Sequence, residues 1–192
     1  MSRLATTWKT VVGGSILFLL ATACFPSSQT KREDSQQSCR DFVQKFYDWY
    51  VPKLLKAFDT KEDGGWGLAL RYKGSEFSPE LVRQLKEDRD AQDNSPGEIV
   101  GLDFDPFLYS QDPSEHFVVG NITDKDGRYL VEVYGMSSGK RREKVVPELV
   151  RKNGRWLFVN FHYPDSGHGS GKDGDLLNLL KSLREDRQNH PK

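Results

Sequence analysis

The sequence predicts an α+β domain in which helices pack on a four-stranded antiparallel sheet. The first half of the folded part and its C-terminus show helical apolar periodicity, whereas the second half holds four segments of strand character. Two pairs of these segments are joined by Asp126-Gly127 and by Asn153-Gly154, which are the residues that tight hairpin turns require. Residues 38–192 have a common domain size, so we expect one globular domain with one core.

Residues 1–23 are typical of a signal peptide. Arg3 and Lys9 precede an uncharged apolar run at residues 11–20, which is half as long as the roughly 20 residues that cross a bilayer core. The run Ala21-Thr22-Ala23 then places small residues where a signal peptidase cuts. We therefore expect the chain to be exported without a permanent membrane span.

Cys24 directly follows the expected cleavage site. Small residues before a cysteine are typical of bacterial lipoproteins, in which acylation of Cys24 would hold the protein at a membrane, facing the periplasm or the outside. Ordinary cleavage after Ala23 fits the same residues and would give a soluble periplasmic or secreted protein. Residues 24–37 are polar, and we expect them to form a tether. Cys39 is left without a partner if Cys24 is acylated, and a disulfide between the two is the alternative.

The charge of the chain argues against a nucleic-acid partner. The whole sequence has 28 basic and 28 acidic residues, and the predicted signal peptide holds two of the basic and none of the acidic ones, which leaves a charge of about −2. A phosphate backbone requires a basic surface. Two cysteines do not build a metal site, and the acidic residues lack the spacing of a calcium-binding loop. We expect no metal and no cofactor.

Two helices are expected before the strands and one after them. The first begins at Ser38, and Pro52 should kink it or end its first part. A loop follows at residues 60–67, and the second helix begins at Ser78-Pro79, a capping serine followed by a proline in the first turn. The last helix spans residues 175–186. The first helix carries an aromatic stripe that consists of Phe42, Phe46, Trp49 and Tyr50.

The expected strands cover residues 117–123, 128–136, 145–152 and 155–163. Both faces of the last strand are largely apolar, so one should pack on the helices and the other should line a concavity or contact a partner. Strict alternation places Leu157, Val159, Phe161 and Tyr163 on one face and Trp156, Phe158, Asn160 and His162 on the other.

Four motifs lie along residues 39–183: Phe42-x3-Phe46-Tyr47-x-Trp49-Tyr50-x-Pro52, Phe77-Ser78-Pro79-Glu80-Leu81, Leu102-Asp103-Phe104-Asp105-Pro106-Phe107 with Gln111-Asp112, and Asn153-Gly154-x-Trp156 through Tyr163-Pro164. Together they resemble an uncharacterised family of bacterial envelope proteins that includes lipoproteins. The resemblance implies a cone-shaped fold like those of nuclear transport factor two, ketosteroid isomerase and cystatin, in which a curved sheet wraps helices around a pocket. The segment 166–175 lengthens the link to the last helix beyond the family's pattern.

Acidic and aromatic residues are the candidates for lining such a pocket. Asp103 and Asp105 would form an acidic rim, and a carboxylate there acts as a general base when burial tunes its pKa. The pair Asp105-Pro106 is also typical of a turn in which the aspartate accepts hydrogen bonds from backbone amides. Aromatic side chains would suit a small apolar ligand, and at these spacings they are also what a core requires. The candidate pocket residues are Tyr47, Tyr50, Asp103, Asp105, His162 and Tyr163.

These residues contain no constellation typical of a catalytic centre. We therefore expect a non-catalytic envelope protein, held at a membrane by Cys24, that binds another envelope protein or a small ligand. The alternative is a cone-fold enzyme that uses Asp103 or Asp105 for proton transfer. A pocket acid with a shifted pKa beside Tyr47 or Tyr50 would favour the enzyme, and a filled interior would favour the binding protein.

Overall fold

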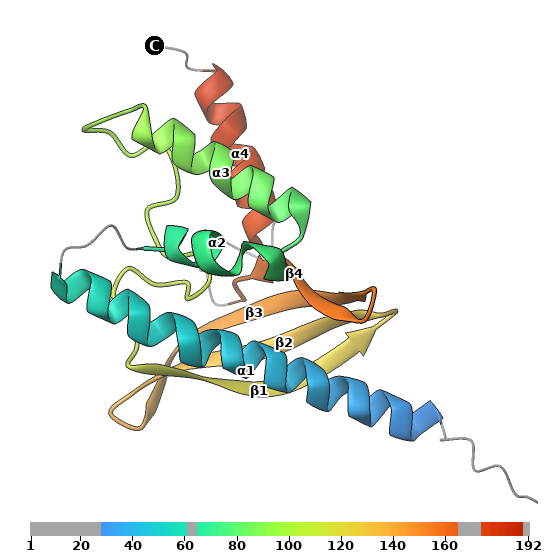
Figure 1. The fold of residues 1–192 in the computed structure, drawn as a ribbon. Helices are drawn as coiled ribbons and strands as arrows, with labels where there is room; N and C mark the ends of the chain where they lie inside the picture. Colours follow the sequence, from blue (N-terminus) through green and yellow to red (C-terminus); the bar gives the residue numbers. More distant parts are fainter. Residues whose placement is uncertain (1–27, 61–64, 165–173, 190–192) are drawn as a thin grey trace, which may run out of the picture.

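The computed structural model describes residues 28–60, 65–164 and 174–189. Within these residues the chain has the predicted α+β architecture, and its four strands form one open antiparallel sheet in the order β1-β2-β3-β4 (Figure 1). The predicted signal peptide, Cys24 and the segment 165–173 lie outside the described residues. The elements are α1 (Ser28–Thr60), α2 (Gly67–Lys73), the short 3-10 helix η1 (Gly74–Glu76), α3 (Pro79–Asp93), β1 (His116–Lys125), β2 (Arg128–Ser137), β3 (Lys140–Lys152), β4 (Arg155–His162) and α4 (Leu176–Asn189).

Two-residue turns join the strands. Asp126-Gly127 and Asn153-Gly154 have φ values of 55° and 79°, and of 51° and 77°, which confirms both predicted hairpins. The turn between β2 and β3 is Ser138-Gly139, with φ values of 50° and 72°, and it was not predicted. Strand β3 therefore begins at Lys140, five residues before its expected start.

Helix α1 is longer than the sequence predicts. It starts at Ser28 and continues past Pro52 to Thr60, so the part of the expected tether from Ser28 onward is helical. The guanidinium of Arg32 lies 3.5 Å from the carboxylate of Asp124, which joins the early turns of α1 to the β1–β2 hairpin. The polar composition of this segment suggested a tether, but Glu, Gln, Lys and Arg also favour helices, and here the helix has support from the sheet.

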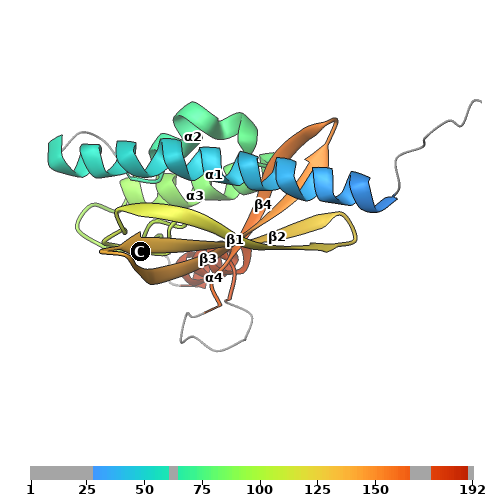
Figure 2. The same cartoon turned by 90° about the horizontal axis from the view of Figure 1, so that it is seen from below.

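Helix α1 lies across one face of the sheet, and α3 and α4 pack against each other near β4 (Figures 1 and 2). The space between α1 and the sheet is filled by aromatic rings. The ring of Phe46 lies 4.9 Å from that of Phe158, 5.7 Å from that of Phe77 and 5.9 Å from that of Phe107, measured between centroids. All four side chains are buried, so the interior on this side of the sheet is a packed core.

The alternation of side chains between the two faces of the sheet is interrupted in β4 at Val159. Consecutive residues of β3 pair with Phe158 and Asn160, so Val159 is an extra residue in the ladder and forms a β-bulge. The bulge turns Phe161 and Tyr163 into the core, where both are buried. The strict alternation predicted for this strand is therefore wrong beyond Val159: Asn160 and His162 lie on the sheet face opposite the core.

Side chains of α1 close the outer edge of β1. The amide nitrogen of Gln44 donates to the carbonyl of Phe117 at 2.9 Å, and its amide oxygen accepts from the N–H of Val119 at 3.0 Å. Arg40 donates to the carbonyl of Val119 at 3.1 Å. Gln44 thus bonds β1 as a neighbouring strand would, and this stretch is closed to further strand pairing.

Candidate functional site

Three tyrosine hydroxyls converge on the turn that begins at Asp105. From α1, Tyr50 donates to Oδ2 of Asp105, and Tyr47 donates to the carbonyl of Phe107 at 2.9 Å. Just beyond β4, Tyr163 donates to the carbonyl of Pro106 at 2.9 Å. The three side chains are at most 2% exposed, so they line no open pocket, and they fix the turn to the helix and to the sheet.

Both carboxyl oxygens of Asp105 are occupied. Oδ1 accepts from the N–H groups of Phe107 at 2.9 Å and Leu108 at 3.2 Å, and Oδ2 accepts from Tyr50. This is the turn arrangement that the Asp-Pro pair indicated. Burial raises the pKa of Asp105 to about 7, although the hydrogen bonds from Tyr50 and the two amides oppose the shift. The group is therefore a buried acid that titrates near neutral pH and is held in place by three donors.

The backbone beyond Asp105 closes on itself. The N–H of Asp105 donates to the carbonyl of Ser110 at 3.0 Å, and Tyr109 takes a positive φ of 53°, which is uncommon for an aromatic residue. Its ring stacks on that of Tyr163 with centroids 4.5 Å apart, and this contact holds the unusual conformation. The turn is thus held in one conformation, and it forms one wall of the groove described next.

A groove of about 530 Å³ opens beside this turn, between the start of α2, the end of α3 and the loop that follows α3. Asp103 is exposed, and the amide nitrogen of Gln111 donates to its backbone carbonyl at 3.0 Å. Within the described part of the chain, the only hydrogen bond to the Asp103 carboxylate is a long one, 3.5 Å, from the same amide. Asp103 and Asp105 are the charged residues among those that line the groove. The lining consists of Gly65, Trp66, Gln92, Ile99, Leu102, Asp103, Phe104, Asp105, Ser110 and Gln111.

Sequence reasoning missed the part of this groove that comes from the loop after α3. No role is assigned from the sequence to residues 92–99, although Ile99 lies in the groove and is 77% exposed. An apolar pair, Ile99-Val100, at the end of a polar stretch was the available signal. Trp66 was likewise assigned to a loop without a role.

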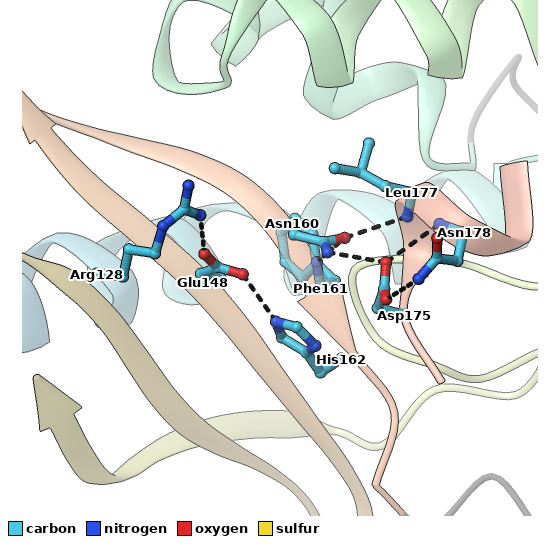
Figure 3. A network of polar contacts seen from close by, with 8 residues as sticks. All are labelled: Arg128, Glu148, Asn160, Phe161, His162, Asp175, Leu177 and Asn178. Carbon is cyan, nitrogen blue, oxygen red and sulfur yellow. Dashed lines mark hydrogen bonds and ion pairs between the residues drawn. The ribbon is translucent and has the colours of Figure 1, made fainter. Parts of the chain in front are cut away.

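His162 lies on the other face of the sheet, away from the tyrosines. Its Nε2 is 2.9 Å from Oε2 of Glu148, and Arg128 pairs with the other oxygen of the same carboxylate (Figure 3). Asn160, on this face as well, donates to Asp175 at 2.8 Å and accepts from the N–H of Leu177 at 3.1 Å, which ties β4 to the start of α4. The candidate pocket residues are therefore divided: three tyrosines in the core, two aspartates at the groove and His162 behind the sheet.

No protein-family model matches the chain, and no curated protein sequence matches it. The solved structures include a distantly similar protein. It is a protein of unknown function from Bacteroides thetaiotaomicron VPI-5482, with a TM-score of 0.46 and 19% sequence identity, and the match covers 70% of this chain and 98% of that one. A similarity at this level gives no indication of function.

Cys39 is a free thiol that is fully buried on the inner side of α1. Burial raises its pKa to about 12, so the thiolate that disulfide exchange requires is not formed at neutral pH. A disulfide with Cys24 would require Cys39 to leave the core. Across the described ranges, no helix is long and apolar enough to span a membrane, and no three His, Cys, Asp or Glu side chains cluster as metal ligands.

Proposed function

We propose that the chain is an exported envelope protein, held at a membrane through an acylated Cys24, whose folded domain has a binding role and not a catalytic one. The observation that carries the second half of this proposal is the state of Asp105. Its two oxygens accept three hydrogen bonds, and the tyrosines around it are packed in the core. A general base must reach the proton that it abstracts, and Asp105 is occupied on both sides.

The first half of the proposal is supported by the segment around Cys24 and by the burial of Cys39. The small residues before Cys24 suit lipoprotein cleavage, and the other cysteine is not placed to form a disulfide with it. Because the described part of α1 starts at Ser28, only three residues separate Cys24 from it, and the four Cα–Cα steps span at most about 14 Å. An acyl group at Cys24 would hold the domain close to the membrane surface.

Intact mass and membrane fractionation of the expressed chain test the anchor. We expect the wild type to carry acyl mass and to sediment with membranes, and the Cys24→Ser variant to do neither. Cys39→Ala is the matched control, because it removes the other thiol and should leave the acyl mass and the membrane fraction unchanged. If wild type and Cys24→Ser are both soluble and cut after Ala23, the anchor is refuted.

The second candidate is proton-transfer catalysis at Asp105, which is favoured by a pKa near 7 at the wall of the groove. A substrate would have to displace the hydroxyl of Tyr50 to reach Oδ2. The test is deuterium exchange from D2O into carbon acids that bind the groove. Exchange that is catalysed by the wild type and lost in Asp105→Asn would establish the enzyme, and its absence for every bound carbon acid would leave the binding role.

A further inference from the structure

We infer that the groove beside Asp105 binds a small organic cation, an ammonium or guanidinium group carried on an apolar body. This inference deepens the proposed binding role and rests on it. Three features of the groove support it: an exposed apolar side chain, a loop that is held in place from several sides, and a carboxylate that has no cationic partner within the described residues.

Ile99 supplies the exposed apolar surface. Its side chain is 77% exposed, whereas large apolar side chains of this domain are mostly buried. It lies with Trp66, Leu102 and Phe104, which are only partly buried, along the wall of the groove. An apolar ligand body placed here would remove all four side chains from water, which is the main driving force in small-molecule sites.

The loop that carries Ile99 is held in this position. The side-chain oxygen of Gln92 accepts from the N–H groups of Val100 at 3.0 Å and Gly101 at 3.2 Å. Arg187, on α4, donates to the carbonyl of Val100 at 2.8 Å. Ile99 therefore stays exposed because its neighbours in the chain are bonded, and a preformed site of this kind loses little conformational entropy when a ligand binds.

A buried ion pair between α3 and α4 also supports this loop. Asp88, on α3, has a side chain that is 2% exposed, and its Oδ1 lies 2.8 Å from the guanidinium of Arg187. Its Oδ2 accepts from the N–H of Leu102 at 2.9 Å. Gly101 is required here, because a Cβ at this position would lie 2.7 Å from Oδ2 of Asp88. Two helices, α3 and α4, thus fix one short loop beside the groove.

Charge selects a cation over other ligands. Asp103 is an exposed carboxylate at the groove, and in the described ranges no basic side chain pairs with it. Two arginines that contact residues of the groove or of its loop have acidic partners of their own: Arg89 pairs with Asp93 at 3.8 Å and lies over the ring of Trp66, and Arg187 pairs with Asp88. A cation on an apolar body would pair with Asp103 and place its body against the apolar wall, whereas an anion would be repelled.

The test is a titration that follows the backbone amide chemical shifts of the protein. The sample is the mature protein, purified after the expressing cells have carried out any cleavage or acylation. The probes are 2-phenylethylamine, the neutral 2-phenylethanol and the anionic phenylacetate, each titrated at millimolar concentration. We expect the amine to shift the amides of residues 99–111 and to bind about threefold more tightly than the alcohol, which is the scale of one exposed ion pair. Phenylacetate should bind least.

Two variants with matched controls locate the site. Asp103→Asn should lower the affinity for the amine to that for the alcohol, and Asp112→Asn, an exposed carboxylate outside the lining, should leave both affinities unchanged. Ile99→Ser should weaken amine and alcohol alike, and Val118→Ser, an exposed apolar residue on β1, should weaken neither. Equal affinities for amine and alcohol, an unchanged Asp103→Asn variant, or no shifts at residues 99–111 with any probe would each overturn the inference. None of these results depends on membrane fractionation, so the proposed lipid anchor and the proposed cation site can be refuted independently of each other.

Discussion

The buried acid at position 105 should make the stability of the fold depend on pH in an unusual direction. The pKa of Asp105 is raised from 3.8 to about 7 in the folded protein, so the folded state binds a proton that the unfolded state releases between these pH values. Stability is therefore greatest below the unfolded pKa and falls as pH rises through the folded pKa. The slope is about 1.4 kcal/mol per pH unit, and the total loss is on the order of 4 kcal/mol.

Urea unfolding at closely spaced pH values from 4 to 8 measures this loss. Asp105→Asn keeps an oxygen that accepts from the two backbone amides, and it does not titrate. The difference in unfolding free energy between wild type and Asp105→Asn isolates this group from all others that titrate in the same range. We expect that difference to shift against the wild type by on the order of 4 kcal/mol between pH 4 and pH 8.

Two tyrosine variants test the physical cause. Tyr50→Phe removes a hydrogen bond that lowers the pKa of Asp105, so the pH range of the loss should extend to higher values. Tyr47→Phe is the control, because Tyr47 donates to the carbonyl of Phe107 and not to the carboxylate. If the difference in unfolding free energy between wild type and Asp105→Asn does not change with pH, or changes in favour of the wild type as pH rises, the pKa of Asp105 is not raised in the folded protein.

The remaining predictions concern the edge of β1, the loop after α3 and the bulge in β4. Gln44→Glu keeps the acceptor but loses the donor to the β1 carbonyl, and should lower the free energy of unfolding by about 1–3 kcal/mol in urea titrations; an unchanged midpoint would refute the role of this amide. Gly101→Ala should cost about 1–3 kcal/mol through its contact with Asp88, whereas Gly74→Ala, which meets nothing within 4 Å, should cost less than 1 kcal/mol by the same assay. Deletion of Val159 should preserve the cooperative thermal transition, because Asn160 and Phe161 keep their β3 partners and Phe161 stays on the core face; loss of the transition would refute the assignment of Val159 as the extra residue of the ladder.

Local signals were sufficient for much of the fold. Asp126-Gly127 and Asn153-Gly154 specify their turns through the positive φ angles that these residues tolerate, and Ser78 caps α3 by accepting from the N–H of Leu81. The start of α1 was missed because residues 28–37 are polar, and the sequence does not show that Arg32 meets a hairpin 92 residues away.

The errors in β4 and at the groove have a common cause. The bulge at Val159 is defined by the pairing of β4 with β3, so a single strand read alone shows only alternation. Ile99 stays exposed because Arg187 bonds its neighbour Val100, and these residues are far apart in the sequence. The turn at Asp105 was weighed correctly because its hydrogen bonds are local, to the second and third residues along the chain.

The uninterrupted run of α1 sets a distance within the proposed anchored protein. From Ser28 to Tyr50, which bonds the wall of the groove, the helix rises through 22 residue-to-residue steps, or about 33 Å. A helix packed on a sheet along its length acts as a stiff arm, so the groove would stand at a nearly fixed reach from the point of attachment. Extra residues inserted before Ser28 would add slack to that reach without altering the groove, and any ligand that is itself fixed in the envelope would be met, or missed, according to the length of this arm.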